Sequence, residues 1–298
     1  MSKLPLISVI VPVYNASPTL SLCLNSLEKL DYPKSKLEII VVDNGSTDGS
    51  DKIAKEFNVR LYYERSLKSS YQARNTGITN ATGDLIAFTD SDCIVSHDWL
   101  INLTRFWDDD KIGCFAGEIL SYEPRTLIEK FSDRHEIMKQ VGARSHPYMP
   151  YTATANSSYR KDVFSKIGYF NPRLVSGGDA DFSWRMQNET SLKIKFIPEA
   201  VVYHRHRTNV IELYKQFKKN EYGQVLLNQL YPNMKLKTKN ERKSEFIRAI
   251  YSSIRWLPGN LIRFVRGERD FLTLMSPFIY IIASFGTYMG RLSKSDVQ

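Results

Sequence analysis

Three apolar runs in the first third of the chain each end in a polar turn, and this alternation constrains the fold more than any other feature. The runs are Ile7–Val11, Leu37–Val42 and Leu85–Phe88. Short apolar runs bounded by turn residues are typical of buried strands. A segment whose leucines share one helical face follows the first run. Strand, polar turn and helix in this order predict an α/β fold built on a parallel sheet.

Two carboxylates, Asp90 and Asp92, stand just beyond the third run with one residue between them. In an open α/β sheet the carboxyl ends of the strands border the ligand crevice. Two carboxylates at that edge repel each other unless a cation binds there, and Mg²⁺ binds proteins through one or two carboxylates plus substrate phosphates. An Asp-rich turn or helix cap is the alternative for an isolated pair. The neighbouring motifs favour a metal and diphosphate site.

Five motifs occur along the chain in a fixed order. They read Pro12-Val-Tyr-Asn15, Asp43-Asn-Gly-Ser-Thr-Asp48, Ala73-Arg-Asn-Thr-Gly77, Thr89-Asp-Ser-Asp92 and Gly177-Gly-Asp-Ala-Asp-Phe-Ser-Trp-Arg185. Through these motifs the chain resembles the family 2 glycosyltransferases of the GT-A fold, which are inverting enzymes that use nucleotide-sugar donors. The resemblance covers about residues 5 to 207. It implies a Rossmann-like, mostly parallel sheet flanked by helices in a catalytic domain at 1–206, and a helical appendage follows at 207–298.

The first three motifs are expected to bind the donor nucleotide. By resemblance, the first loop lies along the nucleotide through Pro12, Tyr14 and Asn15, although a plain strand-ending turn is the alternative. Asp43 would face the base, because a carboxylate there accepts from N3–H of uracil or thymine, or from N1–H and the N2 amine of guanine. Arg74 would lie near the ribose or diphosphate, since a guanidinium binds phosphate oxygens bidentately. A solvated helix charge is the alternative for this arginine.

The fourth motif supplies the expected metal site. By resemblance Asp92 ligates a divalent cation, Mg²⁺ or Mn²⁺, and Asp90 contacts the ribose or a metal-bound water. The cation bridges the diphosphate oxygens and stabilises the charge on the leaving nucleoside diphosphate. The family often has a third ligand near the position of His204. A structural histidine is the alternative reading of His204, and His206 is a second candidate ligand.

The fifth motif supplies the expected general base, Asp179. Inverting transfer needs a carboxylate that takes the proton of the acceptor hydroxyl. The family usually has Glu-Asp at this point, whereas this chain has Gly178-Asp179. The expected acceptor-binding residues are Gly178, Asp181, Trp184 and Arg185. The alternatives are a helix cap for Asp181, the core for Trp184 and the diphosphate for Arg185.

The basic charge of the chain is confined to its C-terminal third. Residues 205–298 carry 17 Lys and Arg against 7 Asp and Glu, whereas residues 1–204 carry 24 against 25, which together give the net charge of +9. Such asymmetry indicates contact with an anionic partner, either a membrane surface or nucleic acid. Basic helices are predicted over Asn209–Leu230 and Ser244–Arg266, with a charged connector at Lys235–Lys243 and an interruption at Pro258-Gly259.

An uncharged stretch, Phe271–Gly290, follows these helices and has the length that a membrane span needs. It predicts membrane contact, either as one span or as an interfacial or re-entrant helix, and a buried core helix is the alternative. The basic residues that flank it are Arg266, Arg269, Arg291 and Lys294. We therefore expect a lipid-linked or saccharide acceptor at the cytoplasmic face of the cell membrane, and no nucleic acid partner.

Two rival functions remain at this stage. A nucleotidyltransferase also uses strand-end carboxylates and metal, but the segment after the first strand lacks a Gly-rich, basic loop for a triphosphate. A non-catalytic protein that binds nucleic acid or membrane through its basic third leaves Asp179 unexplained. The three cysteines, Cys23, Cys93 and Cys114, show no zinc-binding spacing and favour a reducing compartment. The N-terminal residues lead directly into a predicted core strand, so no signal peptide is expected.

Overall fold

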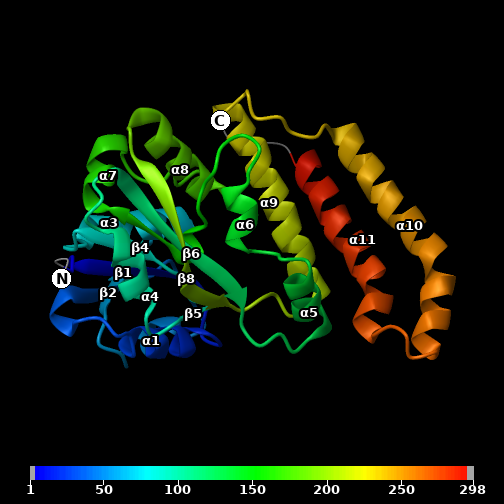
Figure 1. Cartoon of the computed structure of the whole chain (residues 1–298), viewed down its shortest axis with the longest axis horizontal. Coiled ribbons are helices and arrows are strands. Elements are labelled where there is room, and N and C mark those ends of the chain that lie inside the picture. Colours follow the sequence, from blue (N-terminus) through cyan, green and yellow to red (C-terminus); the bar gives the residue numbers. More distant parts are fainter. Residues whose placement is uncertain (1–3, 294–298) are drawn as a thin grey trace. The chain divides into compact units, whose positions relative to one another are not determined.

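The computed structural model describes residues 4–293, and the chain from Ile7 to His204 is built on an eight-stranded mixed sheet (Figure 1). The strand order is β3-β2-β1-β4-β7-β6-β8-β5. The strands are β1 (Ile7–Val13), β2 (Leu37–Asp43), β3 (Arg60–Tyr63), β4 (Leu85–Phe88), β5 (Cys93–Val95), β6 (Ile112–Ser121), β7 (Ser157–Arg160) and β8 (Lys193–His204).

Helices connect these strands and form the C-terminal third. The α-helices are α1 (Leu20–Glu28), α2 (Ser50–Ala54), α3 (Ser70–Asn80), α4 (Trp99–Leu103), α5 (Leu127–Arg134), α6 (Gln140–Arg144), α7 (Lys161–Ile167), α8 (Gly178–Glu189), α9 (Val210–Leu230), α10 (Lys239–Val265) and α11 (Phe271–Leu292). Short 3₁₀ turns lie at η1 (Lys34–Lys36), η2 (Thr104–Phe106) and η3 (Thr154–Asn156).

The three apolar runs form adjacent parallel strands, as the sequence predicted. β1 pairs with β2 and β4, and β2 pairs with β3, all in parallel. β7 is antiparallel to β4 and β6, β8 is parallel to β6, and β5 is antiparallel to β8. Because parallel strands start at the same edge, the turns after β1, β2 and β4 meet at one edge of the sheet. The mixed, mostly parallel α/β fold is therefore confirmed.

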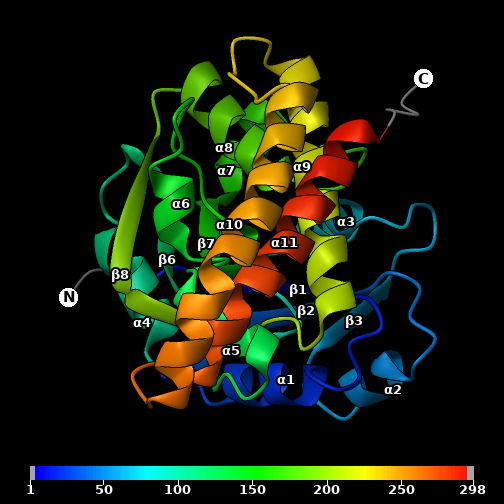
Figure 2. The same cartoon turned by 90° about the vertical axis from the view of Figure 1, so that its right-hand side faces the viewer.

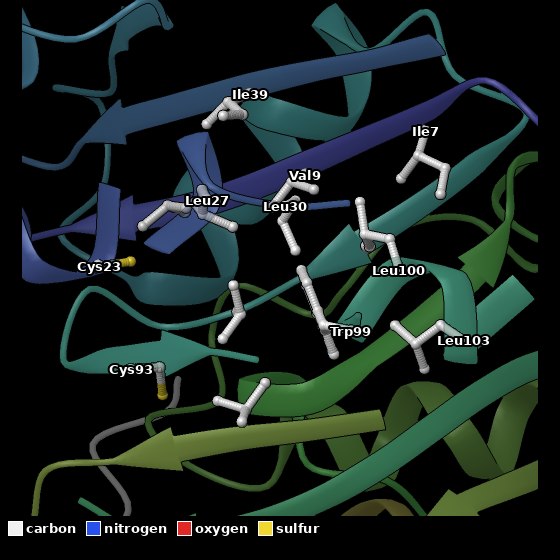
Figure 3. Packing of buried hydrophobic residues seen from close by; sticks show 14 of the residues in the cluster. Ile7, Val9, Cys23, Leu27, Leu30, Ile39, Cys93, Trp99, Leu100 and Leu103 are labelled. Atoms are coloured by element: carbon white, nitrogen blue, oxygen red, sulfur yellow. The ribbon is translucent and has the colours of Figure 1, made fainter. Parts of the chain in front are cut away.

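Because side chains alternate along β1, different helices pack against the two faces of the sheet. Ile7 and Val9 are fully buried in a cluster with Leu27 of α1 and Trp99 of α4, which Figure 3 shows at close range. Ile10 points to the other face, where it lies under Gly77 of α3. Full burial of one such side chain stabilises the fold by roughly 1.5–3 kcal/mol. All three cysteines are free and buried.

The pairing between β6 and β8 is irregular part-way along β8. The register shifts between the pair Gly117–Ile197 and the pair Glu118–Val201, so β8 has extra residues there. The buried Asn156 amide donates to the Glu118 carbonyl at 2.7 Å and to the Ala200 carbonyl at 2.8 Å. These bonds satisfy carbonyls that the irregular ladder would leave unpaired. β8 then continues to His204.

The chain divides into two packed units. The first contains the residues up to Tyr122 together with Met138–Arg173 and Gly178–Arg205, and the second contains Glu123–Ile137, Leu174–Gly177 and the chain from His206 onward. The sequence-based domain prediction of 1–206 and 207–298 did not include the two short early segments in the second unit. Within that unit, Ile128 and Phe131 of α5 pack with apolar residues of α9 and α11.

Three long helices, α9, α10 and α11, run alongside one another in the second unit (Figure 2). The first predicted helix is confirmed, since Asn209 caps α9 by accepting from the Glu212 N–H at 3.0 Å. Two details of the second were wrong. α10 starts at Lys239 within the predicted connector, because Thr238 and Glu241 form a capping box. It also continues through Pro258, because residues on both sides of the proline pack on α11.

The uncharged stretch forms α11, which is long and apolar enough to cross a membrane by length and composition. In the structure 28% of its most apolar window is buried against protein. Arg291 is buried at its end, and Lys294 lies outside the described residues.

Candidate active site

The loop after β1 is tied to the loop after β2. β1 includes Pro12 and ends at Val13, two residues later than predicted, because β2 continues to pair with it up to Asp43. Asn15 has a positive φ of 47°, donates its N–H to Ser46 Oγ at 3.0 Å and accepts from the Thr47 N–H at 2.9 Å. These bonds fix the rim of the carboxyl edge. Tyr14 stays exposed on this rim, with its hydroxyl bonded to Lys68.

Asp43 ends β2 with one carboxylate oxygen engaged and the other available. Oδ1 accepts from the N–H groups of Gly45 at 3.0 Å and Ser46 at 3.1 Å, and from Arg65 Nη1 at 2.6 Å. Oδ2 is buried and has no hydrogen-bond partner among residues 4–293. Burial favours protonation, but the bonds from Ser46 and Arg65 outweigh it and hold the pKa of Asp43 below its usual value. The oxygen Oδ2 is therefore a charged acceptor that faces no protein donor.

Arg74 lies buried on α3, in contrast to the solvated charge considered as its alternative. Its Nη2 donates to Asp90 Oδ1. Its Nε is buried and lacks a hydrogen-bond partner within the described part of the chain. The guanidinium carbon lies 5.6 Å from the ring centre of Tyr71. The structure therefore brings Arg74 to Asp90 and leaves one guanidinium N–H unused.

Asp92 and His204 meet because β5 pairs with β8. Cys93 lies opposite His204 in this antiparallel pair, and the Arg205 N–H donates to the Asp92 carbonyl at 3.0 Å. The His204 Nε2 lies 3.7 Å from Asp92 Oδ1, and His204 is buried. His206 comes two residues after the end of β8, beyond this pairing.

Asp92 offers a carboxylate, which both Mg²⁺ and Mn²⁺ prefer, and His204 offers an imidazole nitrogen, which suits Mn²⁺ better than Mg²⁺. The residues that the structure describes contain no group of three or more His, Cys, Asp or Glu side chains placed to hold a metal ion. Mg²⁺ binds through one or two carboxylates and keeps water and substrate phosphates as its other ligands. A site with Asp92 and His204 as protein ligands fits that chemistry.

Asp179 lies in the first turn of α8 and is held by its neighbours. Its Oδ1 accepts from the Ala180 N–H at 3.1 Å and lies 3.4 Å from the Tyr71 hydroxyl. Burial raises the pKa of Asp179 above its usual value, and the positive charge of Arg74 opposes that rise only in part. A carboxylate with a raised pKa is suited to accept a proton.

Gly178 has no side chain because Tyr71 fills the space. A Cβ at position 178 would lie 2.7 Å from two carbons of the Tyr71 ring. The Tyr71 hydroxyl also accepts from the Gly178 N–H at 2.9 Å. This packing explains why the pair is Gly-Asp where the resembling family usually has Glu-Asp.

The other three residues that were predicted from the fifth motif to bind the acceptor make contacts within the protein. Asp181 is buried and accepts from Arg185 Nε at 3.1 Å and Nη2 at 3.0 Å. Arg185 also donates to the carbonyls of Ile167 and Tyr169. Trp184 is fully buried, and its indole N–H donates to the Met149 carbonyl at 2.9 Å. The geometry thus favours the core alternative for Trp184 and a structural ion pair for Asp181 and Arg185.

Sequence reasoning missed Arg65 and Tyr71. Arg65 follows β3 by two residues and reaches Asp43, and Tyr71 lies on α3 one turn before Arg74. The helical spacing of Tyr71 and Arg74 was a usable signal, since residues three apart share a helix face. Nothing in the sequence near Arg65 indicated its partner.

These loops and their order match a known family. The model of glycosyl transferase family 2 matches residues 8–170, more than half of the chain. The chain belongs to this family. It is a glycosyltransferase, and the resemblance stated from its motifs is confirmed.

This glycosyltransferase has relatives in archaea and bacteria. It is 32% identical over 233 residues to Glycosyltransferase AglE of Haloferax volcanii, a match that covers 75% of this chain and 74% of that protein. It is 28% identical over 213 residues to the Pre-mycofactocin glycosyltransferase of Mycobacterium tuberculosis. That second match covers 68% of this chain but only 43% of the longer relative.

Solved structures share the GT-A fold of this glycosyltransferase. The mannosyltransferase PcManGT from Pyrobaculum calidifontis, in complex with GDP-Man and Mn²⁺, aligns with a TM-score of 0.65 at 16% identity over 96% of this chain and 88% of that one. S. aureus TarS 1-349 in complex with UDP-GlcNAc aligns with a TM-score of 0.54 at 19% identity over 96% and 90% of the two chains. At these identities the similarity concerns the fold.

Proposed function

We propose that this glycosyltransferase moves one sugar from a nucleoside-diphosphate donor to an acceptor hydroxyl, with inversion at the anomeric carbon. The observation that carries the proposal is a pair of buried, unused polar atoms at the carboxyl edge. Asp43 Oδ2 is an acceptor and Arg74 Nε is a donor, and neither has a partner among residues 4–293. Buried polar atoms normally find partners, so both indicate a polar ligand. A nucleoside diphosphate offers a base N–H to the first and phosphate oxygens to the second.

The donor site would extend along the rim from Asp43 to Arg74. Pro12, Tyr14 and Asn15 border the loop in which the nucleotide would lie, and Asp90 would contact the ribose. The bound nucleotide-sugars GDP-Man in PcManGT and UDP-GlcNAc in TarS support this choice of donor class by likeness of fold.

Asp92 and His204 would hold the divalent cation, Mg²⁺ or Mn²⁺. When bound, that cation would neutralise negative charge on the diphosphate leaving group. Arg74 supports the same charge from the protein side through its unused N–H. Its ion pair with Asp90 keeps the guanidinium oriented before the donor arrives.

Asp179 would act as the general base. Its carboxylate takes the proton from the acceptor hydroxyl while the hydroxyl oxygen attacks the anomeric carbon. Tyr71 and the Ala180 N–H hold the carboxylate from one side. Asp179 is largely but not fully buried, so an acceptor would approach its carboxylate from the remaining exposed part. Gly178 borders that opening, and the paired Asp181 and Arg185 and the buried Trp184 would support its floor rather than touch the acceptor.

The acceptor would be a lipid-linked molecule or a saccharide at the cytoplasmic face of the cell membrane. The basic surplus and the apolar surface of the second unit support membrane association.

A screen of nucleotide-sugars with Mg²⁺ or Mn²⁺ tests the proposal. Slow hydrolysis of one donor, with release of a nucleoside diphosphate, is the expected result. Release of pyrophosphate from a nucleoside triphosphate plus sugar phosphate would instead show a nucleotidyltransferase. Binding of oligonucleotides without any donor turnover would show a nucleic-acid-binding protein, and either result would overturn the proposal.

A further inference from the structure

α10 carries a second apolar stripe on the side that faces away from α11. We call it the outer stripe, and its members are Ile247, Tyr251, Ile254, Pro258, Leu261 and Val265. They recur at intervals of four and three residues, so they share one face of the helix. All are exposed, and those other than Pro258 have exposed fractions between 49% and 77%. A monomeric soluble domain seldom exposes such a continuous apolar row.

The opposite side of α10 is already occupied. The Phe246 ring lies 5.1 Å from that of Phe285, and Ser253 Oγ donates to the Pro277 carbonyl at 3.1 Å. Near the end of the helix, Phe264 meets Phe271 with ring centres 6.1 Å apart. Packing on α11 therefore accounts for one apolar face of α10 and leaves the outer stripe without a protein partner in the described residues.

Three arginines stand beside the outer stripe. They are Arg248, Arg255 and Arg266, and all are exposed. No acidic residue occurs between Glu245 and Glu268. None of the three guanidinium groups is paired with a carboxylate in the part of the chain that the structure describes. An apolar face bordered by arginines matches a bilayer that presents acyl chains beneath anionic headgroups.

α11 is held in the helical unit by close contacts with α9. A Cβ on Gly286 would lie 2.6 Å from the Tyr214 carbonyl oxygen, and one on Gly290 would lie 2.4 Å from that of Lys218. The buried Arg291 donates to Glu221 of α9 at 2.5 Å. Glu221 also accepts from Arg242 of α10 at 2.7 Å and 3.0 Å. If α11 left the unit to cross a bilayer, it would leave this buried carboxylate short of a partner, at a considerable cost in stability.

We propose that the outer stripe of α10 lies in the plane of an anionic membrane surface while α11 remains packed against α9. The inference rests on the proposed membrane association and deepens it, because it assigns the membrane contact to α10 and excludes a membrane span by α11. The stripe from Ile247 to Val265 is about 27 Å long at the rise of an α-helix. A second copy of the chain is a poorer occupant, since a two-fold contact along this face would bring six unpaired arginines together.

Flotation of the full chain with vesicles tests this proposal. The chain should float with phosphatidylcholine vesicles that contain phosphatidylglycerol, and it should bind vesicles of phosphatidylcholine alone at least about ten-fold less. The double variant Ile254→Asp/Val265→Asp should lose vesicle binding by a similar factor, because it places charges in the apolar row. The variant Arg248→Ser/Arg255→Ser should lose the preference for the anionic vesicles.

Ile211→Asp is the matched control, because Ile211 is 63% exposed on α9, outside the stripe. It should float like the native chain. Equal loss in this control would overturn the assignment to α10. Resistance of the bound chain to alkaline carbonate extraction would show a span and would also overturn it. So would a dimer in solution that ignores vesicles and dissociates in Ile254→Asp/Val265→Asp.

Donor hydrolysis by the same preparations separates this inference from the proposed function. The native chain and every variant should hydrolyse the donor alike, and their circular dichroism and melting temperatures should match. Hydrolysis without flotation would overturn the membrane surface and leave the glycosyltransfer intact. Flotation that depends on the stripe without hydrolysis of any donor would support the surface and overturn the proposed function.

Discussion

Tyr71 occupies the space that a side chain at position 178 would need, and its hydroxyl accepts the Gly178 N–H at 2.9 Å. The same hydroxyl lies 3.4 Å from Asp179 Oδ1 and can donate to it. One tyrosine on α3 thus sets both the backbone and the carboxylate at the start of α8. The Gly-Asp pair and Tyr71 form one packing arrangement, so the effect of a change at Gly178 should depend on the residue at position 71.

Gly178→Glu tests this arrangement. It restores the Glu-Asp pair of the resembling family, but its Cβ meets the Tyr71 ring, so we expect a loss of roughly 1–3 kcal/mol in the free energy of unfolding. Turnover should fall as Asp179 is displaced. In Tyr71→Ala/Gly178→Glu the clash is absent, and the melting temperature should exceed that expected from adding the two single changes. Strict additivity in urea unfolding would show that the two positions do not interact.

The fold was predictable where the signal is local, and the site was predictable only in part. The apolar runs around β1, β2 and β4 indicate buried strands by themselves, so the carboxyl edge with Asp43 and Asp90 followed. The approach of His204 to Asp92 depends on the β5–β8 pairing, which no local pattern indicates. Only the family resemblance suggested it.

The remaining differences arise from tertiary packing. A proline inside a helix costs roughly 3 kcal/mol, so the sequence favoured an interruption at Pro258, but contacts with α11 on both sides of it keep α10 continuous. Trp184 has the same sequence context whether it stacks on a ligand or fills the core. Its burial depends on residues far away in the sequence, such as Met149.

Asp92→Ala should remove metal-dependent donor turnover and leave the fold intact. The Asp92 side chain is partly exposed at the end of a loop, so its loss opens no core cavity. Titration of Mn²⁺ in the presence of a nucleoside diphosphate should show a strongly weakened metal affinity. Ser91→Ala, a change one residue away, is the control and should retain both properties. Full turnover by Asp92→Ala in the presence of a chelator would remove Asp92 from the metal site.

Glu64 should make the stability of the first unit sensitive to acid. Its carboxylate accepts from the Ser66 N–H at 2.6 Å, Thr76 Oγ1 at 2.6 Å and Gln72 Nε2 at 3.2 Å. Burial opposes ionisation, yet these bonds outweigh it and lower the pKa of Glu64 from 4.5 to about 2. A carboxyl with a lowered pKa in the folded state stabilises the fold above the unfolded pKa and loses that contribution as pH falls.

The window for this loss runs from about pH 4.5 down to about pH 2. In urea unfolding, Glu64→Gln should be less stable than the native chain at neutral pH, by about 1–3 kcal/mol if buried donors lose their partner. The difference should shrink as pH falls through the window. Glu56→Gln, at an exposed glutamate, should follow the native curve. A constant difference at every pH would show that ionisation of Glu64 does not contribute.

Asp179→Asn should separate turnover from stability. The amide keeps the shape of the side chain but cannot take a proton, so transfer should slow by about 10²–10⁴-fold while calorimetry shows donor affinity nearly unchanged.

Burial raises the pKa of Asp179, so the folded state disfavours the ionised carboxylate. A raised pKa of this kind stabilises the fold at low pH, and that contribution is lost as pH rises through the folded value. At neutral pH the native carboxylate is therefore a source of instability, and Asp179→Asn should melt at a higher temperature than the native chain. Asp181→Asn is the contrasting variant, because Asp181 pairs with Arg185, and it should melt at a lower temperature. A fall in the melting temperature of Asp179→Asn, or a collapse of its donor affinity, would show that Asp179 serves the fold or the donor instead of the acceptor proton.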